Sequence, residues 1–175
     1  MELYSRFGEL DSAEEINQVA AGLKKEGDLE SLKVLAKENG LEELDAEDYF
    51  EGLVDALCTP KMAANGKIQI EKEYLGLKEG IADYADWIVQ ECIEDTELAL
   101  AVRKKGKSLA GALGAVLEEA WNIKVPVHKD ILKAAGIKTG RVEVGTPGMK
   151  TVTKLMREYY LGGGENGSEQ TAQEN

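Results

Sequence analysis

The amino-acid sequence predicts an all-α fold that is mostly helical, with at most one small β-hairpin near the C-terminal end. Apolar side chains recur at helical spacing along most of the 175 residues, and capping residues stand ahead of several of these stretches. Only Arg141–Val144 alternates like a strand. With 43% hydrophobic residues the chain can bury one sizeable core or two small ones, so we expect one compact unit with two lobes.

Three helices are expected in residues 1–60, which we interpret as an acidic N-terminal helical lobe. The first follows Ser12, which opens an S-x-x-E capping pattern, and the second runs from Asp28 to Gly40. The third takes Asp45 as its cap and ends ahead of Pro60. The apolar residues expected to face the core are Ile16, Val19, Ala20, Leu23, Leu29, Leu32, Leu35, Ala36, Tyr49, Phe50, Leu53, Val54 and Leu57.

The helical pattern continues through residues 61–161, which we interpret as a C-terminal domain with a basic surface. The pattern is weak from Met62 to Leu75 and strongest from Ile81 to Cys92, where apolar residues follow the i, i+3, i+4, i+7, i+11 spacing. Asp95 can cap a short helix after it. Ser108 opens another, whose inner face is expected to hold Leu109, Leu113, Val116, Leu117, Ala120 and Trp121.

The elements expected beyond residue 123 are short. Val125–Val127 is extended around its proline, residues 129–135 form a short helix, and Thr146-Pro147-Gly148 makes a turn. A final basic helix carries Val152, Leu155, Met156 and Tyr159. Residues 162–175 contain no large apolar side chain, so we expect a disordered tail.

The charges are divided between the two halves of the chain. Met1–Val102 contains nine Lys and Arg against 25 Asp and Glu, a net charge of −16, whereas Arg103–Leu161 contains 12 against five, a net charge of +7. This division is typical of a binding protein whose acidic end meets a cationic surface and whose basic end meets an anionic one.

Two charged clusters stand out, and each has more than one interpretation. The acidic run of Glu42, Glu43, Asp45, Glu47 and Asp48 is either a solvated face or a docking surface. The basic cluster either neutralises the acidic lobe within the same molecule or contacts nucleic acid or protein. It consists of Arg103, Lys104, Lys105 and Lys107 and continues to Lys150, Lys154 and Arg157.

Signatures of catalysis and metal binding are weak. The single histidine, His128, is expected at a helix cap or on the surface, and Cys58 and Cys92 are expected to be buried reduced thiols. Gly106-Lys107-Ser108 resembles the end of a phosphate-binding loop, but Ala101 replaces the first glycine of that motif. We therefore expect no enzyme, no cofactor and no metal, although acid–base catalysis by a carboxylate pair stays open.

The sequence also lacks the marks of membrane targeting. No apolar run reaches the roughly 20 residues that span a bilayer, and the N-terminus carries Glu2 and Glu9 where a signal peptide is basic and then apolar. We expect a cytoplasmic protein without membrane contact. Trp87 and Trp121 lie on or near apolar stripes, which favours the core over an interface.

Several segments carry a family resemblance. They are Phe7-Gly8, Glu14-Glu15-Ile16-Asn17, Glu26-Gly27-Asp28, Leu35-Ala36-Lys37-Glu38-Asn39-Gly40, Ala101 to Leu109, and Gly148 to Tyr160 with Arg157-Glu158-Tyr159-Tyr160. Through these segments, residues 1–161 resemble small proteins encoded on bacterial phages and mobile elements. Residues 81–137 also resemble the PcfK-like proteins of conjugative elements, to which some inhibitors of type II CRISPR effector nucleases are related.

The resemblance implies an anti-CRISPR protein that inhibits by binding and carries no catalytic residue. Its partner would be a type II effector nuclease with its guide RNA, met by Glu42, Glu43, Asp45, Glu47, Asp48 and Asp55. The basic residues would touch guide RNA, DNA or an acidic patch of the nuclease. The alternative is an accessory DNA-binding protein of a conjugative or phage element. Residues 130–137 look like the start of a helix-turn-helix unit, but a strand-like segment follows them.

Overall fold

The computed structural model describes residues 3–138 and 140–162 of the chain. Within them it contains nine helices and one two-stranded antiparallel sheet, which confirms the prediction of a mostly helical fold with one small β pairing. The predicted disordered tail lies, apart from Gly162, outside the described residues. The elements are α1 (Ala13–Glu26), α2 (Leu29–Glu38), α3 (Glu43–Glu51), α4 (Pro60–Tyr74), α5 (Glu79–Glu94), α6 (Thr96–Arg103), α7 (Leu109–Asn122), β1 (Val125–Pro126), α8 (Lys129–Ala134), β2 (Glu143–Val144) and α9 (Met149–Leu161).

Side-chain caps start most of the helices where the sequence indicates. The Ser12 hydroxyl accepts the N–H of Glu15 at 3.1 Å, and the Asp28 carboxylate accepts the N–H of Ser31 at 2.9 Å. Such caps satisfy backbone donors that have no partner inside the helix. His128 caps α8 in the same way, as expected, because its Nδ1 accepts the N–H of Asp130 at 3.3 Å.

The third helix differs from the prediction. It begins at Glu43, and the Asp45 carboxylate accepts the N–H of Glu42 from inside the first turn. It ends at Gly52, whose φ of 81° ends the helix in the left-handed conformation. The expectation that Leu53 and Val54 face the core is therefore wrong, since both lie beyond the helix and are exposed.

Two hydrophobic cores hold the helices together. The first is made by α1, α2, α3 and the chain up to the start of α4, and the second by α4, α5, α6, α7 and α9. Helix α4 belongs to both, because Ala63 packs in the first core and its neighbour Ala64 in the second. The expected boundary at residue 60 therefore falls at the start of the helix that joins the two cores.

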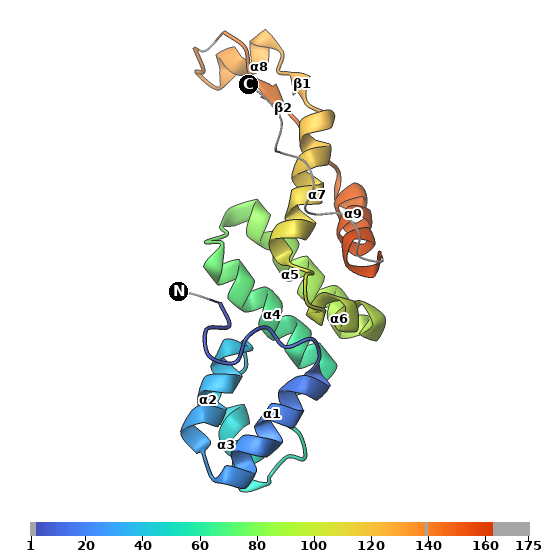
Figure 1. The fold of residues 1–175 in the computed structure, drawn as a ribbon. Coiled ribbons are helices and arrows are strands. Elements are labelled where there is room, and N and C mark those ends of the chain that lie inside the picture. The colour runs from blue at the N-terminus through green and yellow to red at the C-terminus, as the bar shows by residue number, and fades with distance from the viewer. Residues whose placement is uncertain (1–2, 139, 163–175) are drawn as a thin grey trace, which may run out of the picture.

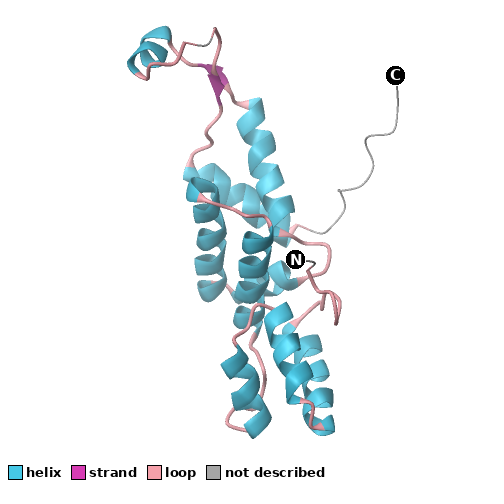
Figure 2. Cartoon of the chain, turned by 90° about the vertical axis from the view of Figure 1, so that its left-hand side faces the viewer, coloured by secondary structure: helices cyan, strands magenta, loops and turns pink. Residues whose placement is uncertain are grey.

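The molecule is elongated, with the N-terminal helices at one end and a slender arm at the other (Figures 1 and 2). The arm, which we define as β1, α8, β2 and their described connections in residues 123–144, projects beyond the end of α7. Its strands pair with Val125 opposite Val144, and the Val127 N–H donates to the Val142 carbonyl at 2.9 Å. Leu132 is the only buried side chain among the described residues of the arm.

The two tryptophans lie in different environments. Trp87 packs partly buried against the second core, in line with the prediction. The prediction of a core position for Trp121 is wrong, because 67% of this side chain is exposed. Trp121 lies in the last turn of α7, and Lys124 at the start of the arm lies over its ring. Figure 1 shows that this end of α7 extends beyond the other helices of the bundle toward the arm.

Candidate partner-binding surfaces

The acidic candidates lie on α3 and the loop that follows it. Glu42, Glu43 and Asp55 are exposed and Asp48 is half-exposed, and none of these four forms an ion pair with a described residue. Glu47 differs, since its carboxylate lies 2.5 Å from Lys33 Nζ, and this hydrogen bond raises the pKa of Lys33. The surface therefore keeps most of its negative charge unneutralised by the chain itself.

Exposed apolar side chains accompany these carboxylates, and sequence reasoning missed them. Leu44 is 64% exposed and Leu53 69%, and Val54 beside it is exposed as well. We call this set, with the carboxylates above, the acidic α3 surface. Leu44 lies in the first turn of α3, and Leu53 and Val54 follow its C-terminal end. Exposed apolar side chains surrounded by polar groups are common on protein-binding surfaces.

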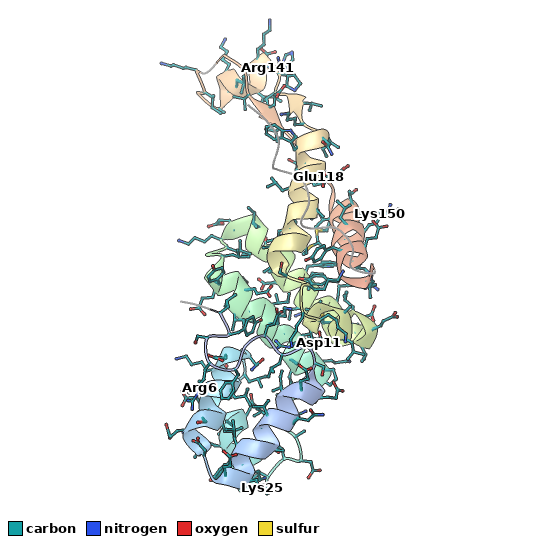
Figure 3. All side chains as sticks on the ribbon, viewed as in Figure 1. Arg6, Asp11, Lys25, Glu118, Arg141 and Lys150 are labelled. Atoms are coloured by element: carbon teal, nitrogen blue, oxygen red, sulfur yellow. The ribbon has the colours of Figure 1, made fainter. Side chains whose placement is uncertain are left out.

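The basic loop after α6 is largely neutralised within the molecule. Lys104 Nζ lies 3.0 Å from the Asp11 carboxylate, whose other oxygen accepts the backbone N–H of Lys105 at 2.8 Å. These hydrogen bonds lower the pKa of Asp11, the backbone one contributing most. Lys105 Nζ also lies 3.9 Å from Glu15. For Lys104 and Lys105 the structure supports internal neutralisation, and Figure 3 shows Asp11 near the middle of the molecule.

Lys107 is held by the C-terminal end of α9 instead of facing a partner. Its ammonium donates to the carbonyls of Tyr159 at 2.6 Å and Gly162 at 2.8 Å, and it lies 5.0 Å from the Tyr159 ring centroid. A cation in this position satisfies carbonyls that the helix leaves unpaired and interacts favourably with the helix dipole. Lys107 therefore fastens α9 to the loop that opens α7.

The prediction that Arg103 belongs to an exposed loop is wrong. Arg103 is the last residue of α6 and only 1% exposed, so it cannot reach a partner. One guanidinium nitrogen donates to the Asn39 side chain at 2.6 Å, and the guanidinium lies 5.8 Å from the Tyr4 ring. Arg103 joins α6 to the turn after α2 and thus connects the two halves of the molecule.

A buried ion pair lies beside this contact and was also missed by sequence reasoning. Lys67 on α4 is fully buried, and its Nζ lies 2.5 Å from the Glu9 carboxylate and 2.9 Å from the Lys104 carbonyl. One turn further, the Glu71 carboxylate accepts the N–H of Leu109 at the start of α7. Burial raises the pKa of Glu71. The i, i+4 spacing of Lys67 and Glu71 was the one available signal, but it is equally common on solvated helices.

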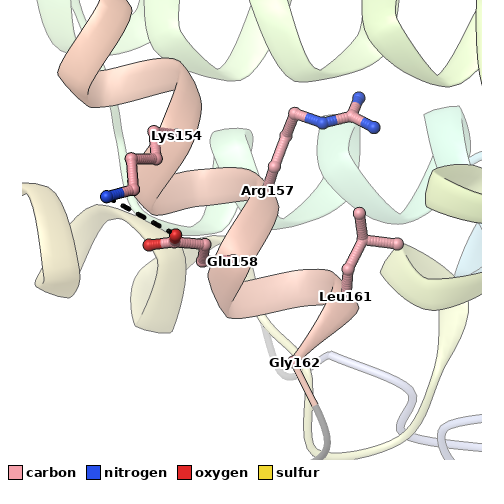
Figure 4. A pocket seen from close by; sticks show the side chains of 5 residues that line it. All are labelled: Lys154, Arg157, Glu158, Leu161 and Gly162. Atoms are coloured by element: carbon pink, nitrogen blue, oxygen red, sulfur yellow. Dashed lines mark ion pairs between the residues drawn. The ribbon is translucent and has the colours of Figure 1, made fainter.

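The basic residues of α9 lie in different surroundings. Arg157 bridges to Asp95 at 2.6 Å and Glu91 at 3.2 Å, and the Asp95 hydrogen bond raises the pKa of Arg157. Lys154 lies 3.7 Å from Glu158 across an open depression at the end of α9 (Figure 4), and both are exposed. Lys150 is exposed at the start of α9 (Figure 3) and pairs with no described carboxylate. Among the described basic candidates, Lys150 thus keeps a charge without an ionic partner, and Lys154 has the most exposed side chain of those that form an ion pair.

The described residues offer no site for a metal or a reactive thiol. No group of three or more His, Cys, Asp or Glu among them could hold a metal ion. Burial raises the pKa of Cys58 and of Cys92 to about 12, so both thiols stay protonated at neutral pH.

Over the described residues, every helix is either too short or too polar to cross a membrane. Comparison with known proteins returned no matching family model, no matching curated protein and no matching solved structure.

Proposed function

We propose that this chain is an anti-CRISPR inhibitor, which binds a type II RNA-guided DNA endonuclease and blocks DNA targeting or cleavage. The observation that carries the proposal is the acidic α3 surface, where Leu44 and Leu53 are exposed among carboxylates without ionic partners. The PcfK-like resemblance of the sequence supports the same partner.

The surface fits the electrostatics of such a nuclease. Effectors of this class hold the guide–target heteroduplex in a positively charged channel, and they read the flanking DNA with arginines. Carboxylates at Glu42, Glu43, Asp48 and Asp55 complement such a channel and accelerate the encounter. The exposed leucines add apolar area that solvent-facing carboxylates alone would lack. Inhibition then follows from occupancy, and no catalytic residue is required.

The test is cleavage of a matched target by a purified type II effector loaded with its guide, at increasing amounts of this protein. The expected result is loss of cleavage together with co-elution of the chain with the loaded nuclease. Unchanged cleavage across several effectors of this type would contradict the proposal.

A charge-matched pair of variants locates the contact. Neutralising four carboxylates of the acidic α3 surface should weaken inhibition, because it removes the complementary charge. The test variant is Glu42→Gln, Glu43→Gln, Asp48→Asn and Asp55→Asn. The control changes the net charge equally at exposed acids of α4, α5 and α6, namely Glu73→Gln, Asp83→Asn, Glu94→Gln and Glu97→Gln. Equal loss in both variants would show that net charge, and not this surface, governs binding.

We infer a second candidate function, an accessory DNA-binding protein, from the arm. Lys129, Lys133 and Lys138 project there without a described ionic partner, at the end of the molecule far from the acidic lobe (Figure 1). Such a protein should shift bare duplex DNA, and the affinity should fall steeply with salt as counterions are released. Absence of a shift at low salt would remove this candidate without affecting the first.

A further inference from the structure

Helix α7 has an apolar stripe on the side that faces away from the core. Ala110, Gly114, Leu117 and Trp121 follow each other at spacings of four, three and four residues, so they share one face of the helix. All four are exposed, and at 69% exposure Leu117, like Trp121, does not face the core as the sequence predicted. The core-facing residues of α7, Leu109, Ala112 and Val116, lie on the other side.

No described part of the chain packs over this stripe. A Cβ atom added at Gly114 would meet no heavy atom within 4 Å. The Lys124 Nζ lies 3.1 Å from the Trp121 ring centroid. Exposed apolar patches commonly mark interaction sites, and tryptophan is among the residues that contribute most binding energy at protein interfaces.

The order of small and large residues along the stripe identifies the occupant as another α7. We propose that two copies of this chain associate through antiparallel pairing of their α7 helices. A two-fold axis between Gly114 and Leu117 places Leu117 of one copy against Gly114 of the other, and Trp121 against Ala110. Each large side chain then enters a space left by a small one, as knobs enter holes. A parallel pairing would instead oppose tryptophan to tryptophan and leave gaps at the small residues.

The charges of the molecule favour the same arrangement. Antiparallel pairing points the arm of each copy toward the N-terminal half of the other, because α7 begins beside the bundle and ends at the arm (Figure 1). The arm contains five Lys and Arg against two Asp and Glu. Helices α4, α5 and α6, which lie on that side, expose Glu73, Asp83, Glu94 and Glu97 without a described ionic partner, so opposite charges are available for the contact.

The arm also supplies area that the stripe lacks. A stable interface buries about 800 Å² on each partner, which is more than four residues of one helix provide. Ile131 and Ile137 are exposed on the arm and would be covered in this arrangement. The described residues of the arm include a single buried side chain, so contact with a second copy would also give the arm a core.

The first test is sedimentation of the full chain from about 1 to about 100 µM, where a dimer that strengthens with concentration is expected. Gly114→Gln should raise the dissociation constant at least about 100-fold, because both symmetric leucine contacts are lost. The same substitution should raise the urea midpoint of the monomer, since glutamine favours helix and has open space there. A chain that stays monomeric throughout, or a Gly114→Gln variant that dimerises like the parent, overturns the proposal.

Cross-linking tests the direction of the helices. Ala110→Cys and Trp121→Cys variants, mixed and oxidised, should give the disulfide-linked heterodimer. Ala110→Cys alone should stay unlinked, because its two copies would lie about 16 Å apart along the helix axis. The native Cys58 and Cys92 are buried and do not compete. Efficient self-linking of Ala110→Cys would overturn the antiparallel pairing. The inference does not depend on the proposed function, because these readouts need no nuclease.

Discussion

A glycine-to-alanine substitution at Gly66 should destabilise the protein, although alanine normally favours a helix. Gly66 lies inside α4, where the helix crosses the turn after α2. A Cβ atom at this position would lie 2.0 Å from the Asn39 carbonyl oxygen and 3.0 Å from that of Gly40. Both neighbours are backbone atoms, so no side-chain rotation can make room. The two segments must separate.

The magnitude follows from three contributions to the free energy of unfolding. Alanine gains about 0.5–1 kcal/mol of helix propensity relative to glycine. Overpacking a tight contact costs about 1–3 kcal/mol. Displacing Asn39 also disturbs its 2.6 Å hydrogen bond from Arg103, and leaving such a buried charged donor unpaired costs about 1–3 kcal/mol. We therefore expect Gly66→Ala to lower the free energy of unfolding by about 1–5 kcal/mol.

The assay is urea unfolding followed by circular dichroism, with Gly22→Ala as the matched control. Gly22 is also inside a helix, α1, but it is exposed and a Cβ there meets nothing within 4 Å. This control should gain about 0.5–1 kcal/mol. If both variants shift stability equally, close packing of α4 on the turn is not what Gly66 provides, and the reasoning fails.

Two further predictions concern the buried charges between the lobes. Burial raises the pKa of Glu71 in the folded state above its ordinary 4.5. The folded state therefore binds this proton more tightly than the unfolded state does. As the pH rises from 4.5 through the raised pKa of the folded state, the contribution of Glu71 to the free energy of unfolding falls. Glu71→Gln should therefore gain stability relative to the parent as pH rises through this interval, measured by urea titration at several pH values; a constant difference would contradict it. Lys67→Met breaks the pair with Glu9, whose side chain is 30% exposed and can be solvated. A loss of about 1–3 kcal/mol is expected by thermal unfolding, and an unchanged midpoint would show that the pair adds nothing.

The sequence was sufficient for most of the helices because their signals are local. Ser12 and Asp28 cap helices with their own side chains, and the hydroxyl and carboxylate bond to N–H groups three residues on. The helix that contains Ile81 to Cys92 could likewise be predicted from the spacing of its own apolar residues, without knowing which helices it packs against. The third helix was misjudged because the left-handed turn at Gly52 overrode an apolar pattern that continued past it.

The candidate basic residues could not be sorted from the sequence, since their partners are remote. Lys104 donates a hydrogen bond to Asp11, which is 93 positions away in the sequence, and Arg103 donates one to Asn39, which is 64 positions away. Adjacent residues with the same charge thus have opposite environments, one exposed and one buried. A local pattern reports the charge of such residues but carries no information on what neutralises them.

Net charge over a segment is consequently a poor guide to where a charged molecule can act. The basic loop contributes strongly to the positive charge of Arg103–Leu161. Its Lys104 and Lys105 nevertheless form ion pairs with acidic residues of the N-terminal lobe, where the two lobes meet. Exposed charge without a described ionic partner remains on the acidic α3 surface at one end and on the lysines of the arm at the other, and also on Lys150 of α9 between them. Each end also exposes large apolar side chains, Leu44 and Leu53 at one and Trp121 beside the other. Because apolar groups must leave water for such contacts to be stable, these side chains separate binding surfaces from merely charged ones.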